Sequence, residues 1–263
     1  MTCALIISTY NWPEALSLCL QSVAEQSRLP DEIIIADDGS REPTRQFIEQ
    51  FKAQTHLPIR HIWHPDEGFR LAAIRNRAMA AAESDYIIQI DGDIILHRNF
   101  VEDHLRQAQE GFYVVGSRVL LGEAFSQEAL QKGTLPQITL YTNGLRNRMN
   151  SLRSLPLSRL FGASRKVRAR GCNMSFFRKD IIAINGYNED MVGWGEEDTE
   201  MVARLHHNNI GTKRLKFAGI AYHIFHKEAS RSSHSLNLSI KERTLTERTL
   251  RCQNGIDKYL QGA

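Results

Sequence analysis

Acidic residues follow two apolar stretches of the chain, and their side chains could bind a cation or a sugar nucleotide. Asp91-Gly92-Asp93 closes the run Tyr86–Ile90, and the glycine allows a tight bend between the two carboxylates. Hard oxygen ligands suit Mg²⁺ or Mn²⁺ on a diphosphate. Asp37 and Asp38 follow Ile33–Ala36 in the same way, where a carboxylate could accept hydrogen bonds from a nucleobase or ribose. Each acidic pair is equally typical of a solvated turn when taken alone.

A third group of acids, Glu196, Glu197 and Asp198, precedes an amphipathic helical pattern. Neighbouring carboxylates repel one another unless a cation, hydrogen bonds or a helix N-terminus stabilises them. Trp194 beside them offers an apolar face for a sugar ring, and a carboxylate here could act as a general base toward a hydroxyl. Acids also favour the first turn of any helix, but the other motifs favour the catalytic interpretation.

Histidines and arginines add two further candidates. His223 and His226 lie three residues apart after an apolar run, a spacing that lets both rings reach one cation. A lone histidine is more often structural, but Asp93 makes metal binding the better interpretation. At the start of a helical pattern, Arg75 and the helix amides could meet a phosphate or base. Arg77 is equally well explained by a surface ion pair.

Hydrophobic periodicity predicts the elements that must position these residues. Strands are expected at 4–8, 33–36, 59–62, 86–90, 112–121 and 172–177, and an extended stretch at 215–224. Helices are expected at 13–26, 43–54, 71–82, 100–109 and 197–207, with a terminal helix at 236–260. Such alternation implies a mostly parallel α/β sheet with helices on both faces, which binds ligands at the carboxyl ends of its strands.

The composition is that of an ordinary soluble globular protein, but the charge is unevenly placed. The 263 residues carry a net charge of +3, with 42% hydrophobic and 24% charged residues. Eleven Lys or Arg and no acid lie in Ala129–Lys179, leaving 22 basic and 30 acidic residues elsewhere. Four scattered cysteines suggest reduced thiols in a cytosol, and we expect neither a signal peptide nor a membrane span.

Together the motifs resemble glycosyltransferase family 2, the inverting enzymes with a GT-A fold. The resemblance spans about residues 3–228, and its last motif is similar to the W-G-x-E-D acceptor segment of β-1,4-galactosyltransferases and bacterial chondroitin polymerases. It rests on Ile7–Asn11, Asp37–Ser40, Gly68–Arg77, Asp91–Asp93, Arg170–Phe177 and Gly193–Asp198.

The resemblance implies a single α/β GT-A (Rossmann-like) domain, mostly parallel, with a C-terminal helical extension. The expected domain covers 1–228 and the extension 229–263. Within the domain we expect a nucleotide-sugar-binding half at 1–100, a basic excursion at 129–170 and an acceptor and metal half at 171–228.

The resemblance also implies a role for each matching residue. Asp198 is the expected catalytic base, and Trp194 and Glu197 are expected to position the acceptor. The metal ligands are Asp93, His223 and His226, where galactosyltransferases carry a methionine in place of the first histidine. Glu196 departs from the glycine more common there. The expected nucleotide-sugar contacts are Thr9, Tyr10, Asn11, Asp37, Arg75, Asp91 and Gly92.

The implied activity is inverting, Mn²⁺- or Mg²⁺-dependent sugar transfer of the kind that builds bacterial surface polysaccharide or lipopolysaccharide. We expect a UDP-sugar donor, a hydroxyl of a glycan or lipid-linked acceptor, and no nucleic-acid partner. A cytoplasmic location is expected, with peripheral contact to the inner face of the membrane through the basic segment 132–170 as a further hypothesis.

Two other interpretations remain open at this point. A sugar-nucleotide pyrophosphorylase would share the architecture, but Ser8–Pro13 lacks the Gly-rich, Lys/Arg-containing phosphate loop expected of one. A non-catalytic polyanion- or membrane-binding protein would use the basic segment. That segment has only Tyr141 and Phe161 before Arg170, so base stacking is poorly supported.

Overall fold

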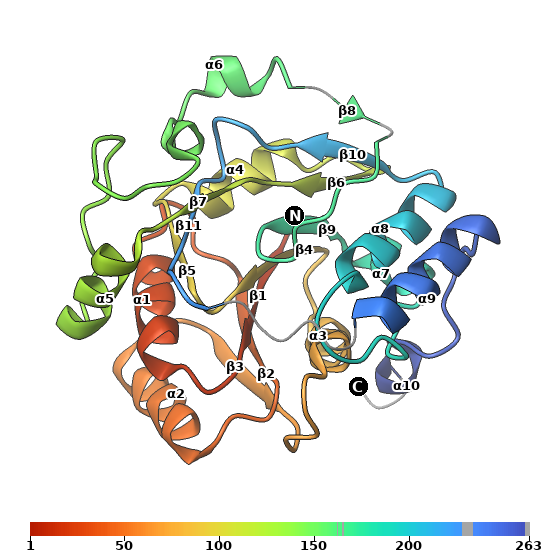
Figure 1. Ribbon diagram of the computed structural model, residues 1–263, viewed down its shortest axis with the longest axis horizontal. Coiled ribbons are helices and arrows are strands. Elements are labelled where there is room, and N and C mark those ends of the chain that lie inside the picture. Colours follow the sequence, from red (N-terminus) through yellow and green to blue (C-terminus); the bar gives the residue numbers. More distant parts are fainter. Residues whose placement is uncertain (162, 165, 228–233, 261–263) are drawn as a thin grey trace.

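The computed structural model describes residues 1–161, 163–164, 166–227 and 234–260. Its centre is an eight-stranded sheet with the order β3-β2-β1-β4-β9-β6-β10-β8. Helices flank this sheet, with α1, α2 and α5 to its left in Figure 1 and α3, α8, α9 and α10 to its right. The strands are β1 (Cys3–Thr9), β2 (Glu32–Asp37), β3 (Ile59–Trp63), β4 (Tyr86–Asp91), β6 (Phe112–Val115), β8 (Ala163–Ser164), β9 (Met174–Phe177) and β10 (Gly211–Arg214).

The helices confirm most of the periodicity signals in the sequence. The larger ones are α1 (Pro13–Ala24), α2 (Glu42–Gln54), α3 (Leu71–Ala81), α4 (Phe100–Gln107), α5 (Glu123–Lys132), α8 (Glu197–His207) and α9 (His234–Thr246). The short ones are the 3₁₀ turn η1 (Arg148–Ser151), α6 (Leu155–Ser158), α7 (Arg178–Ala183) and α10 (Asp257–Leu260).

Continuous apolar strands form the centre of the sheet because both of its faces are covered. In β1, Leu5 and Ile7 pack into the core cluster that includes α1. Ala4 and Ile6 face the opposite way, into the cluster that includes α3. This alternation is the period of two that a strand requires, and it accounts for the unbroken hydrophobic run.

Strand register brings the two acidic turns to one edge of the sheet. β1 pairs parallel with β2 and with β4, so Thr9 lies opposite Asp37 and Ser8 lies opposite Asp91. β9 is antiparallel to both β4 and β6, which makes the sheet mostly rather than entirely parallel. The carboxyl ends of the first four strands therefore open toward the same side.

A second, three-stranded sheet carries the histidine pair. Its order is β5 (Ile94–Leu96), β11 (Ala221–His223) and β7 (Arg118–Leu120). His223 pairs with Ile94, the residue that follows Asp93. The backbone of Ile224 also donates to the Asp93 carbonyl at 2.9 Å. This pairing brings together residues that are far apart in the sequence.

Several predicted boundaries are wrong, each for a local reason. The strand predicted at 112–121 is two strands in two sheets, because the chain turns at Gly116, where a Cβ would overlap the Asn173 side chain. The stretch predicted as extended at 215–224 holds only β11. The helix predicted at 236–260 stops at Thr246, and the following chain buries Cys252 and Ile256 before α10 begins. Helix α5 was not predicted.

Candidate active site

A cleft of about 950 Å³ opens at the carboxyl edge of the sheet and holds most of the predicted site residues. Among the parts of the chain that line it are the ends of β1 and β4, the acidic loop before α8, the second sheet and residues 169–172. The predicted site residues in its lining are Thr9, Tyr10, Arg75, Asp91, Gly92, Asp93, Trp194, Glu197, Asp198, His223 and His226.

Arg75 joins the acids from the two halves of the cleft. Its side chain is 1% exposed, and its two terminal nitrogens lie 2.9 Å from Asp91 Oδ1 and 3.0 Å from Asp198 Oδ1. Nε donates to Ser8 Oγ at 3.2 Å. Although burial disfavours its charge, Tyr187 and the two carboxylates outweigh this effect and raise the pKa of Arg75. Arg75 therefore remains cationic and holds the carboxylates of Asp91 and Asp198 in place.

Two carboxyl groups in the cleft have raised pKa values. Burial, with repulsion from Asp93 and Asp198, raises the pKa of Asp91 to about 6 despite Arg75. Burial and repulsion from Asp198 raise the pKa of Glu197 to about 7. Perturbed carboxyl groups that converge in a cleft are typical of ligand-binding and catalytic sites.

Asp198 is the acid that combines access to the cleft with a fixed orientation. Its side chain is 20% exposed, so a ligand hydroxyl can reach it. The Tyr187 hydroxyl donates to Oδ1 at 2.7 Å, and burial raises the pKa of that tyrosine well above its ordinary value. Gln89 lies 3.0 Å from the same hydroxyl and donates to the Gly171 carbonyl at 2.9 Å. The other carboxylate oxygen, Asp198 Oδ2, does not accept the hydrogen bond from Tyr187 and faces Gly171.

Gly171 supplies the space in which the Asp198 carboxylate lies. A Cβ added at this position would overlap both carboxylate oxygens of Asp198. Gly171→Ala is therefore expected to displace Asp198 and to lower turnover by about 10²-fold, the cost of a displacement near 1 Å at a reacting group. The melting temperature and the nucleotide affinity should change little. A Gly133→Ala variant, whose Cβ meets no atom within 4 Å, should keep its turnover, although the left-handed backbone there (φ 62°) strains the substitution and should lower its melting temperature. Wild-type turnover in Gly171→Ala would contradict the placement of Asp198.

Asp93, His223 and His226 form a compact candidate metal centre. Their ligand atoms all lie within 4.8 Å of one another. Asp93 Oδ2 lies 3.4 Å from His223 Nε2 and 3.1 Å from His226 Nε2. The hydrogen bond from His226 to Asp93 raises the pKa of His226 to about 9, whereas burial lowers the pKa of His223. Burial alone would raise the pKa of Asp93, but the two histidines outweigh it and lower that pKa.

The chemistry of the triad fits a divalent cation. Asp93 Oδ1 is buried and has no hydrogen-bond partner among the described residues, which leaves one carboxylate oxygen for a ligand. One carboxylate and two imidazoles are a suitable donor set for a first-row divalent ion such as Mn²⁺.

The acidic loop before α8 is held by helix α9. The Trp194 ring stacks on His234, with centroids 6.2 Å apart and planes at 28°. Lys241 pairs with Glu196 at 2.9 Å, and Asn237 donates to the Gly195 carbonyl at 3.0 Å. Glu196 has a left-handed backbone with φ of 70°. These contacts fix the backbone that presents Trp194 to the cleft.

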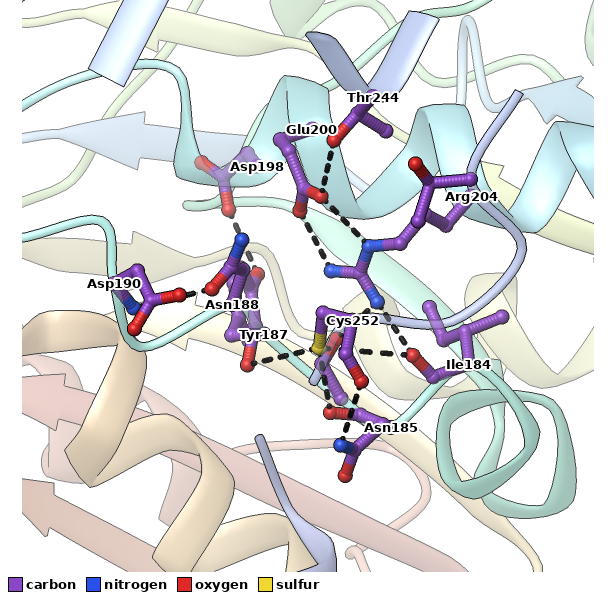
Figure 2. A network of polar contacts seen from close by, with 12 residues as sticks. Ile184, Asn185, Tyr187, Asn188, Asp190, Asp198, Glu200, Arg204, Thr244 and Cys252 are labelled. Atoms are coloured by element: carbon purple, nitrogen blue, oxygen red, sulfur yellow. Dashed lines mark hydrogen bonds and ion pairs between the residues drawn. The ribbon is translucent and has the colours of Figure 1, made fainter. Parts of the chain in front are cut away.

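A second polar network ties α8 to the C-terminal part of the chain (Figure 2). Arg204 and Glu200 form a two-pronged ion pair at 2.6 and 2.8 Å, and neither side chain is more than 1% exposed. Thr244 of α9 donates to Glu200 at 3.0 Å, and Arg204 donates to the carbonyl of Ile184. The network sets the position of the helix whose first turn carries Asp198.

Two predicted nucleotide-binding residues do not line the cleft. Asp37 is fully buried, and its carboxylate binds His61 Nε2 at 2.9 Å and the backbone nitrogen of Ser40 at 2.8 Å. Asn11 has φ of 47°, and its side chain accepts a hydrogen bond from the Arg41 backbone. Both residues shape the turns next to the cleft.

Tyr10 and Asp38, which adjoin Asn11 and Asp37 in the sequence, line the cleft instead. Tyr10 is half exposed, and its hydroxyl donates to Asp66 at 2.9 Å. Asp38 lines the cleft, although its carboxylate also contacts His64 at 2.7 Å and the Arg70 backbone at 3.0 Å. Sequence reasoning singled out the Asp37-Asp38 turn but could not tell which acid faced the ligand side.

Comparison with known structures places the fold among the GT-A glycosyltransferases. GalNAc-T7 with UDP, GalNAc and Mn²⁺ has a TM-score of 0.69 at 14% identity, over 94% of this chain and 49% of that one. The Pyrobaculum calidifontis mannosyltransferase PcManGT with GDP-Man and Mn²⁺ has a TM-score of 0.62 at 15% identity, over 98% and 68%. Staphylococcus aureus TarS 1-349 with UDP has a TM-score of 0.59 at 16% identity, over 92% and 64%. These likenesses show a GT-A-like α/β fold.

Sequence comparison gives the family. The pattern of glycosyl transferase family 2 matches residues 4–181, and that of the N-terminal domain of galactosyltransferase matches residues 158–227. The chain belongs to glycosyl transferase family 2.

Its curated relatives are longer proteins. Chondroitin synthase of Escherichia coli is 24% identical over 84% of this chain and 34% of its own length. Hyaluronan synthase of Pasteurella multocida is 26% identical over 77% and 22%. Validoxylamine A glucosyltransferase of Streptomyces hygroscopicus subsp. limoneus is 26% identical over 79% and 48%. The chain therefore spans between about a fifth and a half of the length of these relatives.

Proposed function

We propose that this enzyme moves a sugar from a UDP-sugar to a hydroxyl of a glycan or lipid-linked acceptor, with inversion at the anomeric carbon and with a divalent cation. The observation that carries the proposal is the placement of Asp198. Its carboxylate faces a cleft that also contains the Asp93, His223 and His226 triad. A base and a candidate metal centre in one cleft are the two groups that single-displacement glycosyl transfer needs.

The reaction follows from these positions. Asp198 takes the proton of the acceptor hydroxyl as its oxygen attacks the anomeric carbon, and the bond from that carbon to the diphosphate breaks. The transition state resembles an oxocarbenium ion, as in glycoside hydrolysis. Asp93, His223 and His226 would hold the cation, which acts as a Lewis acid on the departing diphosphate. Trp194 and Glu197 are the proposed acceptor contacts beside the base.

Support for the donor comes from the lining of the cleft and from the comparisons. Thr9, Tyr10, Gly92 and Asp91 lie at the carboxyl edge of the sheet, and we propose that they contact the nucleotide sugar. UDP is bound in the structures of TarS and GalNAc-T7, while GDP-Man is bound in PcManGT. UDP is therefore our proposed nucleotide, and GDP is the alternative that a direct test must include.

A donor screen tests this function. The protein is incubated with Mn²⁺ and a panel of UDP-, GDP-, dTDP- and CMP-sugars, and release of the nucleotide is measured. We expect slow hydrolysis of one UDP-sugar without any acceptor. A pyrophosphorylase would instead release a nucleoside triphosphate from the nucleotide sugar in the presence of pyrophosphate, and that result would replace the proposal.

The basic segment 132–170 carries a surface suited to an anionic membrane. Beside its cations it exposes Leu157 by 45% and Leu160 by 76%, and it exposes Tyr141, Met149 and Val167 as well. Figure 1 shows α6, which contains Leu157, at the outer edge of the fold. No helix among the described residues is long and apolar enough to cross a membrane. We propose that this segment docks on anionic lipid, where each cation near the surface contributes about 1 kcal/mol.

Vesicle binding checks this docking surface. The double variant Leu157→Ser with Leu160→Ser is expected to bind phosphatidylglycerol vesicles at least about tenfold more weakly, because the apolar contact with lipid is lost. Donor hydrolysis should be unchanged. Leu29→Ser, at an exposed leucine outside the segment, is the matched control. Equal sedimentation of all proteins with these vesicles would refute membrane docking.

The proposed division of the chain follows the same arrangement. We propose a glycosyltransferase domain at 1–228 and a helical extension at 229–263 that supports the acceptor loop through α9. The extension and the basic segment include residues outside the described part of the chain, among them 162, 165, 228–233 and 261–263. A role in bacterial surface polysaccharide synthesis rests on the relatives and is part of the proposal.

A further inference from the structure

Three arginines line the cleft without a carboxylate partner. Arg118, Arg146 and Arg170, here called the arginine cluster, belong to the same lining as Asp198 and the metal triad. Within the described residues none of the three forms an ion pair, although Arg118 lies 3.8 Å from Cys172 Sγ. By contrast, Arg75, which also lines the cleft, pairs with Asp91 and Asp198. The cluster therefore leaves positive charge in the cleft that the protein does not neutralise.

Strand pairing directs two members of the cluster toward the site. In the second sheet, Leu120 lies opposite His223, and Arg118 is two residues earlier on the same face of β7. Arg146 pairs with Leu120 from the other side through two backbone hydrogen bonds of 3.1 and 2.9 Å. Arg118 and Arg146 thus lie beside Leu120, the residue that pairs with His223 of the metal triad.

The third member lies next to the proposed base. Arg170 directly precedes Gly171, on which the Asp198 carboxylate packs. Burial, together with repulsion from Arg118 and Arg214, lowers the pKa of Arg170. Bringing an anion between Arg170 and Arg118 would relieve that repulsion. Glu123 also lines the cleft, but its carboxylate accepts from Gln127 rather than from these arginines.

We infer that the arginine cluster binds an anionic group, a carboxylate or a phosphate, carried by the acceptor. This inference rests on the proposed function. The donor diphosphate already has a counter-charge in the cation at Asp93, whereas Arg170 adjoins the place where the acceptor hydroxyl must meet Asp198. Arginine is suited to this task because its planar fork matches both carboxylate and phosphate. The acceptor is accordingly an acidic sugar or a phosphorylated glycan.

A matched pair of probes tests the inference without knowledge of the donor sugar. Methyl β-D-glucuronide and methyl β-D-glucoside differ only in the carboxylate, and glucose 6-phosphate compared with glucose does the same for phosphate. Each is titrated into the protein saturated with Mn²⁺ and UDP, and binding is followed by ligand-observed NMR. We expect at least one anionic probe to bind about tenfold or more tightly than its neutral partner.

Single substitutions test whether the arginine cluster causes the tighter binding of the anionic probe. Arg118→Gln, Arg146→Gln and Arg170→Gln are each expected to reduce the preference severalfold and to leave UDP affinity unchanged. Arg146 is exposed, so its variant remains informative if a half-buried arginine proves necessary for folding. Arg159→Gln is the control, since Arg159 belongs to the basic segment, is exposed and lies outside the cleft lining.

Three outcomes would overturn the inference: no preference for either anion, a preference that all three variants retain, or an equal loss of UDP and anion binding. The last would assign the cluster to the donor diphosphate. Failure of the proposed function has a different signature, because it would appear as the absence of nucleotide-sugar hydrolysis while anion binding persists.

Discussion

Asp198→Asn is expected to lower sugar transfer by about 10²–10⁴-fold, the contribution that a general base typically makes. Asparagine has the same shape and can still accept the hydrogen bond from Tyr187, which lies 2.7 Å from Oδ1. It cannot take the proton of an acceptor hydroxyl. The loss should therefore appear in kcat, while nucleotide affinity, measured by calorimetry, and the melting temperature remain close to those of the wild type.

The matched control is Asp190→Asn, which changes the same functional group outside the cleft. Asp190 is exposed and accepts a hydrogen bond from Asn254 at 2.8 Å. Its variant should retain full transfer activity. Glu197, whose carboxyl pKa is raised to about 7, is the nearest group able to replace the base. Turnover of Asp198→Asn near the wild-type rate would show that Asp198 is not the base.

Removing the proposed metal ligand Asp93 is the second change with a large expected effect. Asp93→Asn should weaken Mn²⁺ binding by at least about 100-fold, the upper end of what loss of a supporting group costs a metal site. Transfer and donor hydrolysis should fall with it, and excess EDTA should have the same effect on the wild type. Calorimetric titration with Mn²⁺ measures the affinity, with Asp190→Asn as the control. Full turnover in EDTA would exclude a metal requirement.

The same site gives a dependence on pH with a defined sign. In the metal-free protein the pKa of His226 is raised to about 9, so at neutral pH the ring carries a proton that a cation must displace. Mn²⁺ affinity is therefore expected to rise from pH 6 to pH 8, by at most about tenfold per unit, with release of a proton on binding. A calorimetric proton release of zero would contradict the assignment of His226 as a ligand.

The donor edge of the site could be predicted because its position follows from local patterns. Apolar runs such as Ile33–Ala36 and Tyr86–Ile90 indicate buried strands, and polar residues directly after parallel strands must meet at one edge. The structure confirms this arrangement, since Asp91 ends β4 and Thr9 ends the adjacent, parallel β1. The helical pattern after Glu197 was likewise sufficient to place the acidic loop at the start of α8.

Contacts between distant segments could not be predicted in the same way. Arg75 was assigned to the nucleotide from its place at a helix start, yet in the structure its buried guanidinium contacts Asp91 and Asp198. No local pattern reveals that partner, because residue 198 is brought to Arg75 by the whole sheet. The same holds for Tyr187, whose hydroxyl is satisfied only when β4 and α8 are both in place.

The turn after β2 shows a different limit. The motif Asp37–Ser40 marks a turn beside the site, but the orientation of each carboxylate depends on the neighbouring strand. Asp37 lies opposite Trp63 in β3, and His61 of that strand binds its carboxylate. Asp37 is the last residue of β2 and follows its period-two alternation, but that alternation does not extend to Asp38 in the turn that follows.

The network of Glu200, Arg204 and Thr244 has a consequence for the order in which the enzyme acquires activity during synthesis. The strands β1 to β4 are made first and already form the donor edge. Glu200 of α8 can accept its hydrogen bond from Thr244 only after that residue of α9 has been synthesised. Until then α8 and the acidic loop before it lack their contacts with α9. A nascent chain should therefore bind nucleotide before it can transfer sugar.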